Sequence, residues 1–141
     1  MPCWTKLTTY STYPYLSTTN SSAPASLYFY ASSGTYNIAA TPIFDASIPL
    51  NTLMASFKLR KSNATSNITV GVMTDPTDAT TFDSITTVSP STTGVFEQFE
   101  VNLSSYTGVG QYVAFKVAYN TTTNYIYLDD FSIGVIPLCP N

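Results

Sequence analysis

Apolar and polar residues alternate with a period of two along several short stretches of the chain. In residues 53–60 the odd positions are all apolar, whereas the even positions include Lys58 and Arg60. Residues 112–119 repeat the pattern, with Lys116 between two apolar positions. Period two is typical of a strand with one face in the core and the other in solvent. The pattern therefore predicts strands on which Lys58, Arg60 and Lys116 face solvent.

Turn residues separate eight such stretches. The stretches are 27–30, 36–40, 53–60, 68–72, 82–88, 96–103, 112–119 and 125–135. The Ser32-Ser33-Gly34 turn between the first two predicts a β-hairpin. A second tight turn is predicted at 75–78, because Asp and Pro favour the opening positions of turns. The first 26 residues are polar with interspersed aromatic side chains, and we interpret them as a long edge segment.

The spacing of these stretches, without a convincing helix, predicts the fold class. Eight short strands separated by turns are typical of an all-β protein, here a two-sheet antiparallel β-sandwich. Jelly-roll topology is the first choice, and spacing alone leaves an immunoglobulin-like sandwich as the alternative. The abundance of Thr, Ser and Tyr supports the all-β class, because Thr and Tyr favour strands.

Composition and charge exclude several function classes. A chain of 141 residues fits one domain, and no apolar run approaches the roughly 18 residues of a membrane span. We therefore expect no membrane insertion. With only five Lys and Arg and a net charge of −3, binding to a phosphate backbone would be weak, so we expect no nucleic-acid partner. The absence of His excludes a Ser-His-Asp triad and an imidazole metal ligand.

The two cysteines, Cys3 and Cys139, stand near the two ends of the chain. A disulfide between them would tie the terminal strands together and would fit an oxidising, extracytoplasmic location. The alternative is two separate thiols. The N-terminus lacks the charged and apolar regions of a signal peptide. If the protein is secreted, we expect this sequence to be a fragment excised from a longer precursor.

Several segments resemble, in their order along the chain, the segments of one known family. They are Cys3-Trp4, Tyr13-Pro14-Tyr15, residues 26–29, residues 71–78 with Thr81-Phe82, residues 112–116 and residues 127–133. The pattern is similar to the cleaved-adhesin or "choice-of-anchor J" domains, which are MAM-like jelly rolls of bacterial surface proteins related to gingipain adhesin modules. The tail Pro137-Leu138-Cys139-Pro140 resembles the start of a fibronectin type III module. The resemblance implies one β-sandwich domain at 1–136 and the start of a linker at 137–141.

The resemblance also implies a location and a role. It implies display outside the cell, at the cell surface, as a monomeric domain of a multidomain chain that binds carbohydrate or a host-surface glycoprotein. Members of the family often carry structural calcium. This sequence departs from the gingipain modules at 17–22, where Ser-Thr-Thr-Asn-Ser-Ser replaces an Asp- and Gly-rich segment, and the departure puts calcium in doubt.

Asp129 is the candidate metal ligand. If Phe131, Ile133 and Val135 point into the core, period two places Asp129 on the same face. A buried carboxylate is costly unless it is paired, hydrogen-bonded or bound to a metal, and calcium with carbonyl oxygens from loop 20–23 would satisfy it. The alternative is that Asp129 caps backbone N–H groups of a neighbouring loop, with a bulge that turns it outward.

The other carboxylates do not predict catalysis. Asp75, Asp78 and Asp83 are explained by turn formation. Glycoside hydrolysis needs two facing carboxylates, and Glu97 and Glu100 lie on opposite faces of a predicted strand. We therefore expect no enzymatic activity.

The candidate ligand-binding residues are aromatic and cationic. A sugar site needs an exposed aromatic plane and polar groups that hydrogen-bond to hydroxyls. Tyrosines that could supply the rings are Tyr10, Tyr13, Tyr15, Tyr36, Tyr106, Tyr112 and Tyr125. Lys58, Arg60 and Lys116 could join Tyr112 in one patch, and Tyr36 is a further candidate ligand-binding residue, although Tyr is also a common strand residue that covers sandwich edges. We interpret Trp4 as an anchor of the N-terminal segment.

These observations predict a noncatalytic, extracellular adhesin-type module. Its expected ligand is a carbohydrate or another host-surface ligand. The alternative is a structural spacer domain with no ligand of its own.

Overall fold

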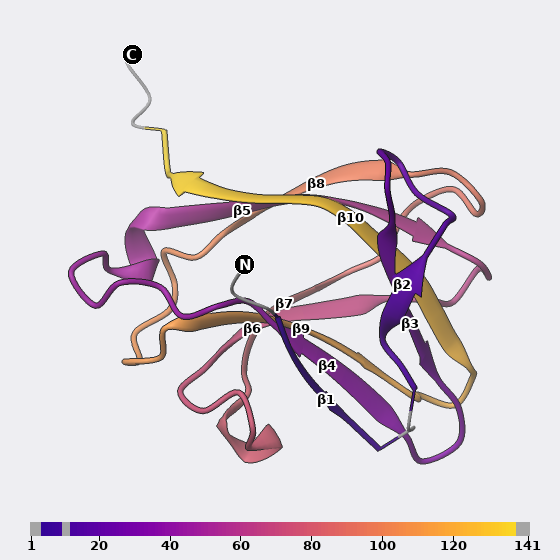
Figure 1. Cartoon of the computed structure of the whole chain (residues 1–141), viewed down its shortest axis with the longest axis horizontal. Coiled ribbons are helices and arrows are strands. Elements are labelled where there is room, and N and C mark those ends of the chain that lie inside the picture. Colours follow the sequence, from indigo (N-terminus) through magenta and orange to yellow (C-terminus); the bar gives the residue numbers. More distant parts are fainter. Residues whose placement is uncertain (1–3, 10–11, 138–141) are drawn as a thin grey trace.

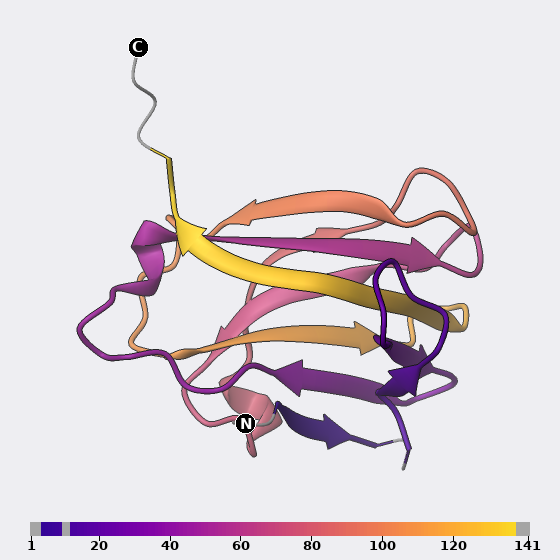
Figure 2. The ribbon, with the colours of Figure 1, turned by 45° about the horizontal axis from the view of Figure 1, so that its top comes forward.

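The computed structural model describes residues 4–9 and 12–137, which form two antiparallel five-stranded sheets (Figure 1). The first sheet contains, in spatial order, β1 (Thr5–Thr8), β4 (Tyr36–Ala40), β9 (Tyr112–Ala118), β6 (Ile68–Met73) and β7 (Asp83–Val88). The second contains β2 (Tyr15–Ser17), β3 (Ser26–Ala31), β10 (Asn124–Val135), β5 (Leu53–Lys61) and β8 (Glu97–Asn102). The sheets face each other as two layers (Figure 2).

The strand order confirms the all-β class and the jelly-roll topology. Strands β3 to β10 fall into the orders β4-β9-β6-β7 and β3-β10-β5-β8, so the chain passes repeatedly from one sheet to the other. This is the arrangement of an eight-stranded jelly roll made of two Greek keys. The short strands β1 and β2 extend the two sheets at one edge each.

The core fills the space between the two inner faces. Its buried residues are Phe29, Ala31, Ala39, Leu50, Leu53, Ala55, Phe57, Leu59, Ile68, Val70, Val72, Val101, Leu103, Tyr106, Val113, Phe115, Val117, Ile126 and Leu128. Phe57 of one sheet meets Phe115 of the other edge to face, with ring centres 5.1 Å apart. Fully burying a side chain of this size contributes about 1.5–3 kcal/mol. The inward-facing side chains that alternate along β5 and β9 therefore hold the two sheets together.

Helical structure in residues 4–9 and 12–137 is confined to two single turns of 3-10 helix. They are η1 (Leu50–Thr52) and η2 (Ala79–Thr81). The Asp78 carboxylate caps η2 by accepting from Thr80 N–H at 3.0 Å, and Asp75 accepts from Thr77 N–H at 2.9 Å. Turn formation by these two carboxylates is thus confirmed. No helix in this part of the chain is long and apolar enough to span a bilayer.

The predicted hairpin of residues 27–30 and 36–40 is wrong, because β3 and β4 belong to different sheets. The turn exists, with Thr35 N–H donating to Ser32 C=O at 2.8 Å. Beyond the turn, β3 and β4 do not pair through their backbones. Instead, the buried side chain of Asn37 hydrogen-bonds to the backbone of Tyr30. Its Oδ1 accepts from Tyr30 N–H at 2.9 Å, and its Nδ2 donates to Tyr30 C=O at 2.7 Å. This amide satisfies the backbone where the chain crosses between the layers.

The predicted edge segment contains the two short strands β1 and β2, and Trp4 anchors it. The Trp4 ring packs against the core at 6.1 Å from Phe115 and 5.2 Å from Phe131. The interpretation of Trp4 as an anchor is confirmed. Cys3 and Cys139 lie outside the described residues, as does most of the predicted linker, so the disulfide and the domain boundary stay predictions.

A β-bulge in the middle of β10 changes which residues face the core. Strand β10 pairs with β5 up to Asp129 and again from Ser132, with a shift of register between them. Asp130 occupies the bulge with φ of 52°. Leu128 and Phe131 both pack into the core, with two residues between them. The expectation that Asp129 shares the inner face with Phe131 is therefore wrong, because the extra residue reverses the alternation.

Candidate functional site

Six tyrosines gather on the outer face of the second sheet, which we call the tyrosine face. They are Tyr13, Tyr15, Tyr28, Tyr30, Tyr125 and Tyr127. Backbone pairing aligns three of them in one row across the sheet, since Tyr28 pairs with Tyr15 on one side and with Tyr127 on the other. The next partner of Tyr127 is Arg60 on β5. The row thus runs across four strands and ends at a cation.

The rings of the tyrosine face are packed on one another. Tyr28 and Tyr127 are stacked with ring centres 4.4 Å apart, and Tyr15 meets Tyr28 edge to face at 5.5 Å. Tyr30 and Tyr125 form a second row at 5.7 Å, and the Tyr13 ring lies 5.1 Å from Tyr30. Each such pair contributes about 0.5–1.5 kcal/mol beyond simple burial. The result is a preorganised aromatic surface.

The hydroxyl groups of the tyrosine face can still form hydrogen bonds. Tyr15 is the most open of the rings, with 44% of its surface exposed, and Tyr28 is half-buried. Burial and the neighbouring tyrosines raise the pKa of Tyr28 well above its ordinary value of 10.0. The raised pKa keeps this phenol protonated even in alkaline solution, so it can both donate and accept a hydrogen bond.

Arg60 lies over the aromatic row and has no anionic partner among the described residues. Its guanidinium carbon is 5.6 Å from the centre of the Tyr127 ring, a cation–π distance. Its Nε is the one buried side-chain polar atom in the described part of the chain that lacks a hydrogen-bond partner. Arg60 forms no ion pair with a described residue.

A polar cluster borders the tyrosine face at the bulge. Asp129 Oδ2 accepts from the backbone N–H groups of Ser21 and Ser22 at 2.7 and 2.9 Å. Asp130 accepts from the Ser22 hydroxyl, and its Oδ2 lies 3.6 Å from Lys58 Nζ. The Ser22 hydrogen bond, with a smaller contribution from Lys58, lowers the pKa of Asp130 below its ordinary 3.8. The two carboxylates thus fasten loop 20–22 to β10.

This arrangement does not fit a calcium ion on Asp129. The loop directs N–H groups at the carboxylate, whereas calcium requires several oxygen ligands. Across residues 4–9 and 12–137, no group of three or more acidic or thiol side chains could hold a metal. The structure matches the alternative stated from the sequence, in which a bulge turns Asp129 outward and its carboxylate caps backbone N–H groups of a neighbouring loop. Calcium itself stays a prediction.

The predicted single patch is wrong, because its members lie on opposite outer faces of the sandwich. Lys58 and Arg60 lie on β5 in the second sheet, whereas Tyr36, Tyr112 and Lys116 lie on β4 and β9 in the first. Period two assigns a residue to an inner or outer face, but every sandwich has two outer faces. Whether each of these residues binds a ligand stays a prediction.

The outer face of the first sheet, which we call the covered face, carries a second hydrophobic cluster. Its buried members are Ile38, Ala40, Met73 and Ala114, and its partly buried members are Leu7, Tyr36, Ala79, Phe82 and Tyr112. Lys116 Nζ lies between two rings, 5.3 Å from Tyr36 and 5.6 Å from Phe82. The predicted solvent exposure of Lys116 is therefore only partial, because the segment before β7 folds over this sheet.

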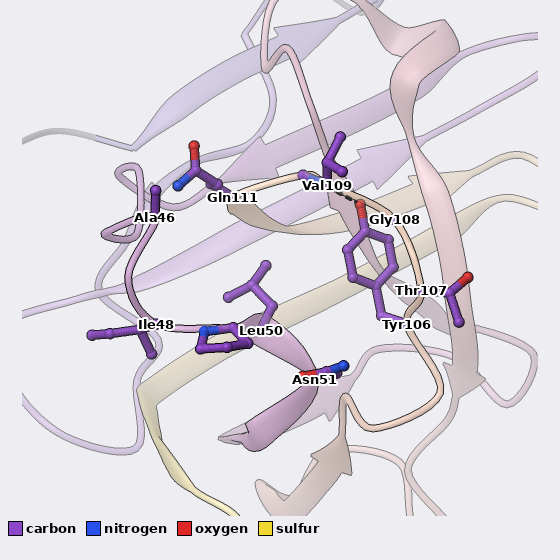
Figure 3. A pocket seen from close by; sticks show the side chains of 11 residues that line it. Ala46, Ile48, Leu50, Asn51, Tyr106, Thr107, Gly108, Val109 and Gln111 are labelled. Atoms are coloured by element: carbon purple, nitrogen blue, oxygen red, sulfur yellow. Dashed lines mark hydrogen bonds between the residues drawn. The ribbon is translucent and has the colours of Figure 1, made fainter.

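A separate pocket of about 360 Å³ lies between the loop before η1 and the loop before β9 (Figure 3). Ile48, Leu50 and Val109 give it an apolar lining. The Tyr106 hydroxyl accepts from Gly110 N–H at 2.7 Å, and the Tyr106 ring is buried. Tyr106, one of the tyrosines proposed for a sugar platform, therefore holds the loop in place.

Sequence reasoning missed three members of the tyrosine face, namely Tyr28, Tyr30 and Tyr127. All three lie in stretches that were identified as strands, at positions that alternate with core residues. Their common face depends on β3 and β10 being neighbours, which only the topology reveals. The alternation of Tyr with Phe or Ile in both stretches was the available signal.

Solved structures with the same fold include cleaved adhesin domains. The K3 domain of Lys-gingipain from Porphyromonas gingivalis W83 aligns with a TM-score of 0.66 and 18% identity, covering 93% of this chain and 90% of that one. The K1 domain from the same organism aligns with a TM-score of 0.59 and 20% identity, covering 95% and 91%.

A carbohydrate-binding protein also shares the fold. TmCBM61, in complex with β-1,4-galactotriose, aligns with a TM-score of 0.59 and 12% identity, covering 94% of this chain and 88% of that one. No family model and no curated protein sequence matches the chain. The chain therefore has the fold of the cleaved adhesin domains, and the resemblance stated from its sequence is confirmed at the level of fold.

Proposed function

We propose that this protein is a noncatalytic, extracellular adhesin-type module that binds carbohydrate on its tyrosine face. The observation that carries the proposal is the row of Tyr15, Tyr28 and Tyr127 that ends at Arg60. A sugar ring has apolar C–H faces and a rim of hydroxyls. The exposed ring of Tyr15 matches the first, and phenol hydroxyls with a guanidinium match the second.

The preorganisation of the face favours binding. The rings are held by their neighbours, so little side-chain freedom is lost when a ligand stacks on them. Tyr15 at the outer end of the row is open to solvent. An extended oligosaccharide lying along the row would meet one ring per strand, at intervals of about 4.8 Å.

The solved structures support the proposal through their kinds of module. The neighbours are adhesin domains and a carbohydrate-binding module in complex with a galactotriose. We extend the same reasoning to location and partners. The module would be displayed outside the cell as a monomeric domain of a longer chain, with carbohydrate or a host-surface glycoprotein as its partner.

A glycan array followed by calorimetry tests the proposal, with β-1,4-galactotriose among the probes. We expect reproducible binding of at least one oligosaccharide, and about a tenfold loss of affinity in Tyr15→Ala. Tyr112→Ala is the matched control, because Tyr112 lies on the covered face. Melting temperatures of both variants show that they are folded. Equal loss in the two variants would contradict the placement of the site.

The spacer alternative has one observation in its favour. The rings of the tyrosine face stack on one another, and these contacts stabilise the face without a ligand. A blank array with a folded protein would support a structural spacer and would overturn the carbohydrate proposal.

A further inference from the structure

The cations of the molecule differ in how their charges are satisfied. Lys58 faces Asp130 at 3.6 Å, and Lys61 is buried with its ammonium donating to a backbone carbonyl at 3.1 Å. Lys116 lies between two aromatic rings. The guanidinium of Arg60, the single arginine of the chain, has neither an ion pair nor a hydrogen bond to a described residue. It is the guanidinium at the end of the tyrosine row.

Aromatic rings, and not carboxylates, flank Arg60 on both neighbouring strands. Its register partner on β10 is Tyr127, and Phe96, just before β8, lies 6.5 Å from that same ring. An acidic residue opposite a cation would have stabilised the sheet, and this chain has more acidic than basic residues. The sheet therefore leaves the charge of Arg60 uncompensated at an aromatic surface.

On each flanking strand one carboxylate is engaged by other groups. Glu97 of β8 accepts from Ser91 N–H at 3.0 Å and from the Ser91 hydroxyl at 2.6 Å. Asp130 of β10 is held by Lys58 and by the Ser22 hydroxyl. Neither carboxylate is free to turn to Arg60. No described carboxylate pairs with the guanidinium, so a ligand can supply the anion.

We infer that the ligand of the tyrosine face is an acidic sugar, whose carboxylate pairs with Arg60 while its ring stacks on the tyrosine row. The inference rests on the proposed function and specifies its substrate class. A planar guanidinium binds a carboxylate through two parallel N–H···O bonds, and it is better suited to this than a lysine ammonium. Carboxylate and ring face together distinguish this ligand from a neutral oligosaccharide and from a free anion.

Calorimetry with matched probes tests the inference. The probes are α-1,4-trigalacturonate beside its methyl ester, and 3′-sialyllactose beside its methyl ester, so that each pair differs chiefly in the charge of the carboxylate. For at least one pair we expect the acid to bind about ten- to a hundredfold more tightly than its neutral partner. Arg60→Gln should abolish that difference and Arg60→Lys should retain part of it. Lys116→Gln, on the covered face, should leave it unchanged.

The remaining outcomes separate the inference from the function it rests on. If wild-type protein binds acid and neutral partners equally, and Tyr15→Ala weakens both, the face binds sugar and the acidic-sugar inference is wrong. If neither kind of probe binds and the array is blank, the proposed function itself fails. A polyglutamate peptide that binds as tightly as the acidic sugar would also overturn the inference. The wild-type comparison needs no variant, so it holds even where a substitution prevents folding.

Discussion

The two outer faces of the sandwich arise from the same alternation and end in different states. On the first sheet, the outward residues form a second hydrophobic cluster, over which Phe82 and the segment before β7 fold. On the second sheet, the outward residues include tyrosines that stack on each other, and Tyr15 among them is 44% exposed. Each face carries a cation among rings, Lys116 on one and Arg60 on the other.

The difference shows that a sheet of this sandwich can be stable when only its inner face is buried, and it suggests where function resides. The apolar surface of the covered face is buried when the protein folds, so its aromatic residues contribute to stability. The tyrosine face retains aromatic surface with polar edges, which is what remains for recognition. Substitutions should therefore affect mainly stability on the covered face and mainly binding on the tyrosine face.

The largest expected effect is at Gly71 under the covered face. A Cβ at this position would lie 2.6 Å from both the Asp83 carbonyl oxygen and the Phe82 ring. Because the carbonyl belongs to the backbone, we expect Gly71→Ala to lower the free energy of unfolding by about 2–3 kcal/mol in urea denaturation. Gly134→Ala is the control, since nothing lies within 4 Å of its Cβ. Similar losses in both variants would show that Phe82 does not press on the sheet.

A smaller loss is expected at the border of the tyrosine face. Asp129→Ala removes the acceptor of two backbone N–H groups more than 100 residues away in sequence. We expect a loss of about 1–2 kcal/mol in the free energy of unfolding, because hydrogen bonds to a charged acceptor are stronger than average. Asp45→Ala, which removes an acceptor for Ser47 two residues away, should cost about 0.5 kcal/mol or less. Equal costs would mean that loop 20–22 gains nothing from β10.

The two cations give a direct comparison of the faces. Lys116→Met removes a charge held between two rings and should cost about 1 kcal/mol in urea denaturation. Arg60→Met removes a guanidinium whose Nε is buried without a partner, and it should change stability by less than about 0.5 kcal/mol. The reverse order would place the structural cation on the tyrosine face and would contradict the division proposed above.

The smallest effect concerns acid stability at the bulge. The pKa of Asp130 is lowered in the folded protein from an ordinary 3.8, first by the Ser22 hydroxyl. A lowered folded-state pKa contributes stability above the unfolded value, and this contribution is lost as the pH falls through the folded value. The difference in urea midpoint between wild type and Asp130→Asn should therefore shrink from about pH 6 to about pH 2. Asn tolerates a positive φ, so the substitution tests charge. A constant difference would rule out this linkage.

Most strands of the fold could be predicted from the sequence. Period two located β3 to β10 within about one or two residues, because each strand has one face in the core. The alternation also distinguished inward Phe57 and Phe115 from outward Lys58 and Lys116. Such alternation depends only on which face of a strand is buried. That face can be predicted from the spacing of apolar residues within the strand itself.

The candidate site could be predicted only in part, because it depends on pairings between distant segments. Arg60 was identified, but Tyr28 and Tyr127 become its neighbours only through the order β3-β10-β5. Lys116 was grouped with Lys58, although they lie on opposite faces. The position of Asp129 was misjudged because its face was inferred from Phe131, Ile133 and Val135 alone, across the change of phase that follows Leu128. Long-range register was thus the missing information in each case.

The bulge at Asp130 gives β10 a change of phase. Before it, the odd-numbered residues such as Tyr127 point to the tyrosine face, and after it the odd-numbered residues such as Phe131 point to the core. Removing this one residue would leave Asp129 outward and Phe131 inward in uninterrupted alternation, with Ser132 still paired with Ser56. A single insertion or deletion elsewhere in the strand would instead exchange the inside and the outside of the residues beyond it. Along β10, a single deletion should therefore be tolerated at the bulge and nowhere else, which is a rule for aligning distant relatives of this sandwich as well as for redesigning it.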